Sequence, residues 1–199
     1  HGEEVPALRW AALEGNIGGK PRGLLMMNDS KHGHSAVDNT IYLTLIRGSF
    51  DPDPLPEIGK HEIHVALRPL DAEVSSGDAT RLAQAFDHPV RIISTDAHEG
   101  GLPSEANLIQ WHAGASVLAS VKKAEDGPDL IIRAYNPSDK IDNVELELNG
   151  KHTGTITEAK AVDLLERPTD VDSVTLESGT IRGTIAPRAI WSARIHVQK

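Results

Sequence analysis

Apolar and polar residues alternate along several short stretches of the chain, which is the pattern of half-buried β-strands. In residues 40–47, TIYLTLIR, apolar side chains occupy both faces, with Ile41, Leu43 and Leu45 sharing one of them. In residues 61–67, HEIHVAL, the apolar side chains share a single face. The pattern predicts two strands over these ranges, joined by a proline-rich loop that cannot continue a sheet ladder.

One helix is expected near residues 76–86, SGDATRLAQAF, where a serine or aspartate can cap the start and Pro89 follows the end. Beyond it, the composition turns polar and rich in glycine. Such a stretch is typical of a linker or an exposed crossing between units. The sequence therefore predicts one domain over residues 1–97, a linker over 98–102 and a second domain over 103–199.

The second domain contains short β-like runs at the spacing expected of an antiparallel sandwich. Asp126-Gly127 and Asn149-Gly150 are typical hairpin signals between such runs. We predict an all-β fold class with strands at residues 116–121, 130–135, 144–148, 153–157, 161–165, 174–176, 180–185 and 191–197.

Charge and composition narrow the classes of partner. The chain has 20 Lys plus Arg against 29 Asp plus Glu, a formal net charge of −9, so its field repels phosphate backbones and anionic lipids. We expect no nucleic acid and no membrane as partner, and no signal or membrane-spanning segment is visible, which leaves a cytoplasmic location as the default. The absence of cysteine excludes disulfides and thiolate catalysis.

The ten histidines make metal binding the first chemistry to weigh. His32, His34 and Asp38, with His61 further along, loosely resemble the ligand set of cupin barrels. However, His32 and His34 flank a glycine in what reads as a polar loop, so solvated loop histidines are the simpler interpretation. The carboxylates show no spacing that singles out an acid and base pair, and no nucleophile motif is present.

Several stretches, taken in order, resemble the C-terminal β region of glycoside hydrolase family 38, the α-mannosidases. They cover nearly the whole chain: EVPALRWAAL at 4–13, GLLMMNDSKHGHSAVDNTIYLTLIRG at 23–48, DPDPLPEIGKHEIHVAL at 51–67, VKKAEDGPDLIIRAYNPSD at 121–139, DLLER at 163–167 and IAPRAIWSARIHV at 185–197.

The resemblance implies that residues 1–97 are the closing half of a galactose-mutarotase-like supersandwich, followed by a small terminal β-sandwich. It also implies a longer parent enzyme, whose N-terminal catalytic domain carries the nucleophile, the acid/base residue and the zinc ligands. That enzyme would hydrolyse α-mannosides with retention. We therefore expect no catalytic residue, metal ligand or cofactor in this chain, and zinc in the catalytic domain with which it associates.

The same resemblance suggests a cleft-facing loop ahead of the strand at 40–47. Its candidate contacts to an α-mannoside substrate are Lys31, His32, His34 and Asp38, with histidines where the family usually has aromatic residues, as in K-Y-G-Y. A stand-alone carbohydrate-binding β-sandwich module and a cupin-like metal-binding protein remain alternatives. We also expect exposed apolar surface near residues 1–50, with a homo-oligomer as its consequence.

Overall fold

The computed structural model of this 199-residue protein describes residues 3–48, 51–52, 57–101, 103–171 and 173–198. Within those residues the strands form antiparallel sheets, and the predicted all-β class is confirmed. The chain divides into two compact units, His1–Ile92 and Ile93–Lys199. This division precedes the predicted linker at 98–102, so that boundary stays a prediction.

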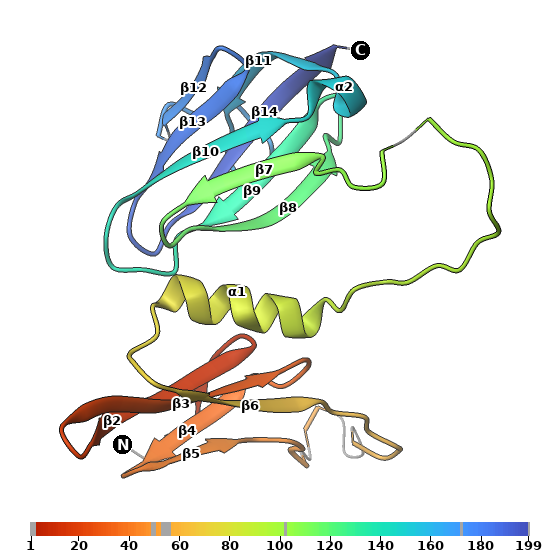
Figure 1. The fold of residues 1–199 in the computed structure, drawn as a ribbon. Helices are drawn as coiled ribbons and strands as arrows, with labels where there is room; N and C mark the ends of the chain where they lie inside the picture. Colours follow the sequence, from red (N-terminus) through yellow and green to blue (C-terminus); the bar gives the residue numbers. More distant parts are fainter. Residues whose placement is uncertain (1–2, 49–50, 53–56, 102, 172, 199) are drawn as a thin grey trace. The chain divides into compact units, whose positions relative to one another are not determined.

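The first unit contains two three-stranded antiparallel sheets (Figure 1). One has the order β2-β3-β6, and the other has the order β1-β4-β5. Their strands are β1 (Val5–Pro6), β2 (Trp10–Ile17), β3 (Lys20–Asn28), β4 (Gly33–Val37), β5 (Thr40–Leu43) and β6 (Val65–Leu70).

Helix α1 (Ser76–Asp87) packs on β2 and β3 and matches the predicted helix closely (Figure 1). The Ser75 hydroxyl caps it by accepting a hydrogen bond from the backbone N–H of Asp78 at 3.1 Å. Its buried alanines, Ala79 and Ala83, face a core that contains Leu25. Small side chains on this helix face allow its backbone to approach the sheet closely.

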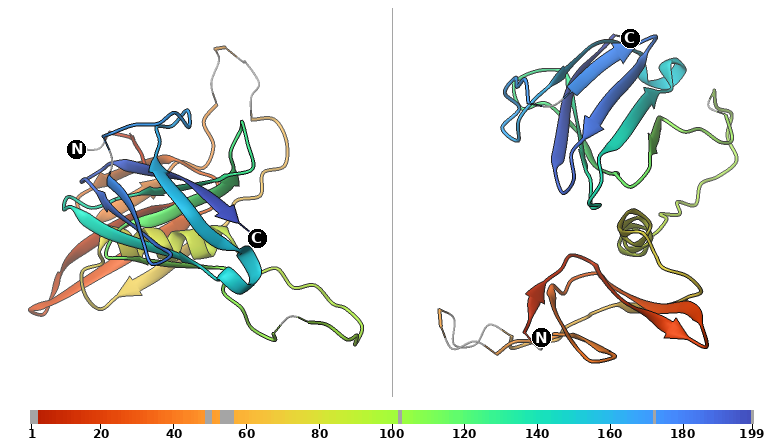
Figure 2. Two further views of the ribbon diagram at one scale, coloured as in Figure 1. Left: turned by 90° about the horizontal axis from the view of Figure 1, so that it is seen from above. Right: turned by 90° about the vertical axis from the view of Figure 1, so that its left-hand side faces the viewer.

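The second unit is a sandwich of two four-stranded antiparallel sheets, which lie face to face (Figure 2). The sheet orders are β12-β13-β10-β7 and β11-β14-β9-β8. The elements are β7 (Ile109–Ala113), β8 (Val117–Lys123), β9 (Leu130–Tyr135), β10 (Asp142–Leu148), α2 (Gly150–Thr153), β11 (Thr155–Ala161), β12 (Ser173–Glu177), β13 (Thr180–Ile185) and β14 (Ile190–Gln198).

The core of the second unit joins both sheets around Trp191, which is 1% exposed. Its indole N–H donates a hydrogen bond to the carbonyl of Ser173 at 3.1 Å, so the buried polar atom is satisfied. The ring lies against Gly183 of the facing sheet, where a Cβ atom would come within 2.8 Å of it. Trp191 and Gly183 thus form a matched large and small pair.

Two strands of the first unit have other bounds than those predicted. The strand predicted at 40–47 ends at Leu43, because β5 pairs with β4 and β4 begins at Gly33, opposite that end. The strand predicted at 61–67 starts instead at Val65, which pairs with the last residue of β3. Alternation marks extended backbone, but a strand also needs a partner of matching length.

The interpretation of His32-Gly33-His34 as a loop was wrong in part, because Gly33 and His34 belong to strand β4. His34 pairs with both Val5 of β1 and Leu43 of β5, which makes β4 the central strand of its sheet. The signal was weak because GHSAV contains few of the large apolar residues by which strands are recognised.

Three expectations for the second unit also differ from the structure. Asn149-Gly150 is not a hairpin turn, since it leads into α2 and joins strands of different sheets. The run at 161–165 is a loop beyond its first residue, with one isolated bridge from Val162 to Pro168. Strand β7 was not predicted, whereas β9 and β13 match the predicted bounds. In the first unit, strands β1 to β3 were not predicted either.

Candidate functional site

Residues 29–32 form the turn between β3 and β4, and Asn28 gives this turn its shape. The Asn28 side chain is 1% exposed, and its Oδ1 atom accepts hydrogen bonds from the backbone N–H groups of Ser30 at 3.2 Å and Lys31 at 2.6 Å. An asparagine side chain that caps two following amides in this way fixes a tight turn. The backbone that carries Lys31 and His32 is therefore held from the buried side.

A second contact ties the same turn to the start of β6. Asp29 accepts hydrogen bonds from the backbone N–H of His64 at 3.2 Å and from the His64 ring Nδ1 at 2.6 Å. The bond from the ring lowers the pKa of Asp29, and the Asp29 carboxylate raises the pKa of His64. Both groups thus favour their charged forms, and the ion pair holds the turn against a residue 35 positions away.

The two histidines of the turn lie in different environments. The His32 side chain is exposed, and its carbonyl accepts a hydrogen bond from the N–H of Ala7 at 2.9 Å. His34 is only 3% exposed, and its Nε2 atom is buried without a hydrogen-bond partner in the described part of the chain. The other ring nitrogen, Nδ1, lies 3.4 Å from the His32 carbonyl oxygen, so the buried ring faces the backbone of the turn on one side.

Asp38 lies at the opposite end of β4, in the turn that leads into β5. It is exposed and has a φ of 49°, which an aspartate tolerates in a tight hairpin turn. At about 3.3 Å per residue, the strand separates it from His34 by roughly 13 Å. The structure therefore brings Lys31, His32 and His34 together but leaves Asp38 apart.

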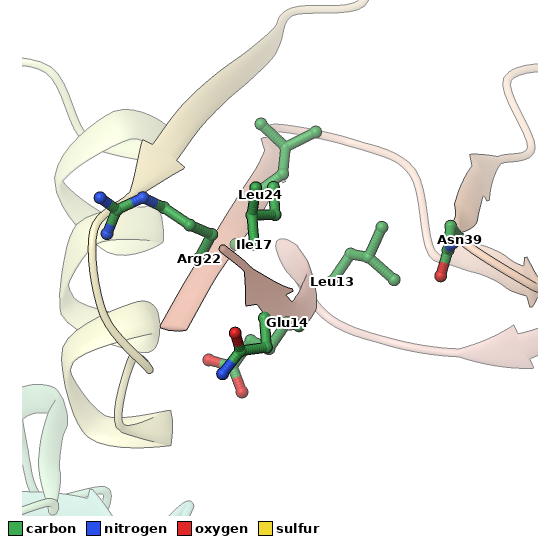
Figure 3. A pocket seen from close by; sticks show the side chains of 9 residues that line it. Leu13, Glu14, Ile17, Arg22, Leu24 and Asn39 are labelled. Atoms are coloured by element: carbon green, nitrogen blue, oxygen red, sulfur yellow. The ribbon is translucent and has the colours of Figure 1, made fainter. Parts of the chain in front are cut away.

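Two open pockets lie on the first unit, and one of them borders the turn. The first lies beside the turn and is lined by Glu4, Val5, Pro6, His32, Gly33 and Arg47. The second lies on β2 and β3, where Figure 3 shows apolar side chains between Arg22 and Asn39. The side chains of this second pocket that Figure 3 labels are Leu13, Glu14, Ile17, Arg22, Leu24 and Asn39.

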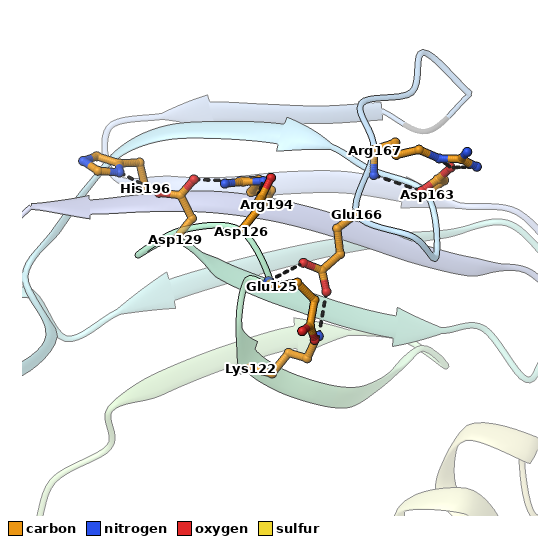
Figure 4. A network of polar contacts seen from close by, with 9 residues as sticks. All are labelled: Lys122, Glu125, Asp126, Asp129, Asp163, Glu166, Arg167, Arg194 and His196. Atoms are coloured by element: carbon orange, nitrogen blue, oxygen red, sulfur yellow. Dashed lines mark hydrogen bonds and ion pairs between the residues drawn. The ribbon is translucent and has the colours of Figure 1, made fainter.

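The second unit carries a charged cluster that the sequence reading did not identify (Figure 4). Asp129 accepts hydrogen bonds from the His196 ring and from the Arg194 guanidinium, each at 2.7 Å. His196 first, and Arg194 next, lower the pKa of this carboxyl group. Its partners lie more than 60 positions away in the sequence, so spacing gave no signal for it.

Among residues 3–48, 51–52, 57–101, 103–171 and 173–198, no group of three or more His, Asp or Glu side chains is arranged to hold a metal ion. In the same part of the chain, neither helix is long and apolar enough to cross a membrane.

Comparison with a family model identifies the second unit. Residues 115–192 match the model of the glycosyl hydrolases family 38 C-terminal beta sandwich domain. The human alpha-mannosidase 2C1 is 29% identical over 210 residues, which cover 98% of this chain and 18% of that protein. A putative mannosylglycerate hydrolase of Halalkalibacterium halodurans is 30% identical over 125 residues, covering 58% of this chain and 14% of that protein.

Solved structures give the same result for the fold. The crystal structure of an alpha-mannosidase from Enterococcus faecalis aligns with a TM-score of 0.71 at 18% identity, over 98% of this chain and 21% of that one. A family 38 protein from the same organism aligns with a TM-score of 0.68 over 98% of this chain and 23% of that one. The chain thus spans about a fifth of the length of these proteins.

Proposed function

Since this chain belongs to glycoside hydrolase family 38, where it corresponds to the C-terminal β region, we propose that it is the non-catalytic β portion of an α-mannosidase. The observation that carries the proposal is that one α-mannosidase relative aligns over 98% of the chain while the chain spans 18% of that relative. Retaining hydrolysis of α-mannosides would be the activity of the complete enzyme.

In this proposal the chemistry belongs to the rest of the polypeptide. A carboxylate nucleophile, an acid/base residue and a zinc ion would lie in an N-terminal catalytic domain, which is the partner of this chain. The zinc would orient the sugar through its hydroxyl groups. The present chain would complete the supersandwich and supply one loop to the substrate cleft.

Apolar surface on the first unit supports an association with further polypeptide. Several large apolar side chains there are more than half exposed, some in strands and some in the segments between them. They include Leu8, Ile17, Ile46 and Leu67, which are between 52% and 73% exposed. Covering this surface with a further protein segment would remove apolar side chains from water, which is favourable.

The cleft contacts proposed for the turn differ in kind. Lys31 and His32 are the side chains that can reach a sugar hydroxyl, because His32 is exposed and Lys31 is partly exposed on a backbone that Asn28 holds. The buried His34 would contribute indirectly. Its Nε2 atom would form a hydrogen bond with a group of the cleft or with a bound water. Asp38 would contact a substrate only where the cleft extends along β4.

The test replaces Lys31 or His32 with alanine in the full-length enzyme and measures kcat/KM on an aryl α-mannoside. We expect each change to lower kcat/KM by about tenfold or more, which corresponds to about 1.4 kcal/mol of lost transition-state binding. Lys151→Ala in α2 and His98→Ala are matched controls at exposed positions of the second unit and should leave kcat/KM unchanged.

Two outcomes would contradict parts of this proposal. If both turn variants keep the wild-type kcat/KM, the turn does not contact the substrate and its role is only to pack against the catalytic domain. A full-length protein that carries this chain and hydrolyses no α-mannoside would remove the assignment of activity altogether.

A further inference from the structure

The connection between β11 and β12 contains a rigid turn, residues 163–167, which we call the DLLER loop. The Asp163 carboxylate accepts hydrogen bonds from the backbone N–H groups of Leu165 at 2.8 Å and Arg167 at 2.9 Å. Its other oxygen pairs with the Arg167 guanidinium at 2.7 to 2.8 Å. The backbone N–H of Asp163 also donates to the Arg167 carbonyl at 2.8 Å, so the loop is closed on itself.

The loop is also fastened to the sheet beneath it, as Figure 4 shows for Glu166. The Glu166 side chain is 8% exposed, and its two oxygens contact the Lys122 ammonium at 2.6 Å and the backbone N–H of Glu125 at 2.9 Å. From β9, the Arg133 guanidinium donates to the Leu164 carbonyl at 2.9 Å. Three groups, from β8, from the turn between β8 and β9 and from β9, therefore hold a short surface loop.

The conformation of Glu166 adds to this evidence. Its φ is 65°, in the left-handed region that a residue with a Cβ atom seldom adopts. Surrounding contacts must hold such a residue in place. With this backbone conformation the Glu166 carboxylate reaches Lys122, while the side chains of Leu164 and Leu165 are exposed.

Those two side chains are the leucines of the loop. Leu164 is 57% exposed and Leu165 is 70% exposed, on a backbone held on both sides. A single exposed leucine needs no explanation, but two consecutive ones on an anchored tip form a preformed apolar surface. A surface that is already ordered loses little conformational entropy when it binds.

We propose that Leu164 and Leu165 dock against an apolar surface on the catalytic portion of the complete α-mannosidase. The inference rests on the function proposed above. More than four-fifths of the human relative lies outside the matched region, so a large polypeptide is available as the occupant. The loop lies within the span that matches the family model.

Charge also favours this occupant over a second copy of the chain. The charges around the loop balance, since Asp163 pairs with Arg167. Lys122 pairs with both Glu166 and Glu125, and the nearby Arg133 guanidinium supplies the second positive charge, so the leucines lie in surroundings of no net charge. Two copies of the chain, each with a net charge of −9, would repel one another on approach. A neutral apolar tip therefore suits a surface on the same polypeptide.

The experiment places the photo-cross-linker benzoylphenylalanine at position 165 of the full-length enzyme, with position 141 as control. Ile141 is 68% exposed in the same unit and is matched in size and exposure. We expect irradiation to link position 165 to a peptide of the catalytic portion, identified by mass spectrometry, and position 141 to give no such link. Links confined to this chain, or a covalent dimer on a denaturing gel, would overturn the proposal.

A paired variant gives a second readout. Leu164→Ser with Leu165→Ser should raise the rate of limited proteolysis between the catalytic portion and this chain by about tenfold, whereas Ile141→Ser with Val171→Ser should not. Unchanged proteolysis together with retained mannoside hydrolysis would refute the docking and leave the proposed function standing. Absent hydrolysis in the unmodified enzyme would refute the function independently of any cross-link.

Discussion

At the residue scale, the turn between β3 and β4 shows how one side chain can order a backbone segment. Asn28 holds two amides of the turn, and Asp29 holds the backbone and the ring of His64. The orientation of Lys31 and His32 therefore depends on residues that no substrate would touch. A change at Asp29 should disturb the turn through the contacts to His64 and through the hydrogen bond that Asp29 accepts from the Ser30 hydroxyl at 2.9 Å.

The ion pair of Asp29 and His64 predicts a defined pH dependence. The pKa of Asp29 is lowered from 3.8, so its stabilising effect is present above pH 3.8 and is lost as pH falls through the folded-state pKa. The pKa of His64 is raised from 6.5, so its effect is complete below pH 6.5 and is lost as pH rises through the folded-state pKa. The pair thus stabilises the turn between these two limits.

Proton NMR of the His64 ring measures this directly. We expect a titration midpoint above 6.5 in the wild-type chain and a lower midpoint in Asp29→Asn, which removes the carboxylate. Glu3→Gln, at an exposed position with no ion pair to His64 in the described residues, serves as the control. A midpoint that does not respond to Asp29→Asn would show that the contact does not form in solution.

At the element scale, the sandwich of the second unit depends on a close approach between β13 and β14. Gly183 on one sheet leaves the space that the Trp191 ring of the other sheet fills. Because protein cores are packed to nearly crystalline density, the ring has little room to move away from an added methyl group. The absence of a side chain at Gly183 thus allows the close contact between β13 and the Trp191 ring.

Gly183→Ala should therefore destabilise the second unit. The added Cβ would lie 2.8 Å from the Trp191 ring, and overpacking of this kind costs about 1 to 3 kcal/mol. Denaturant unfolding followed by tryptophan fluorescence measures the change. Gly15→Ala, where no atom lies within 4 Å of the new Cβ, is the matched control and should leave stability nearly unchanged.

The strands also show why periodicity alone located some elements and misplaced others. Leu130–Tyr135 and Thr180–Ile185 lie inside four-stranded sheets with a partner on each side, so their whole alternating run is paired. The run at 40–47 has the same pattern, but β4 faces only its first half. Its second half is exposed at Leu45 and Ile46, at 47% and 52%.

At the scale of the whole molecule, the chain carries two kinds of surface that suit the same larger protein. Exposed apolar side chains cover parts of the first unit, and two leucines project from the second. The catalytic groups proposed for the enzyme belong to neither unit. Folding of this chain and catalysis by the enzyme should therefore be separable.

We accordingly expect the isolated 199-residue chain not to hydrolyse an aryl α-mannoside. The reaction needs two carboxyl groups in one cleft, one as the nucleophile and the other as the acid. We place both in the catalytic domain. The measurement is release of the aryl group, with the full-length enzyme as the positive control. Turnover by the isolated chain that point changes within it abolish would refute this division of roles.

The sequence by itself determined the all-β class, helix α1 with a serine or an aspartate as its cap, and the resemblance to family 38, because periodicity, capping and ordered motifs are local properties of the chain. Only the tertiary structure decided that His34 is buried while His32 is exposed, and that Glu166 anchors the DLLER loop to Lys122. These outcomes depend on partners such as His64, 35 positions from Asp29, and Lys122, far from Glu166. Such pairs form only when the sheets bring distant residues together, and no spacing in the sequence specifies them.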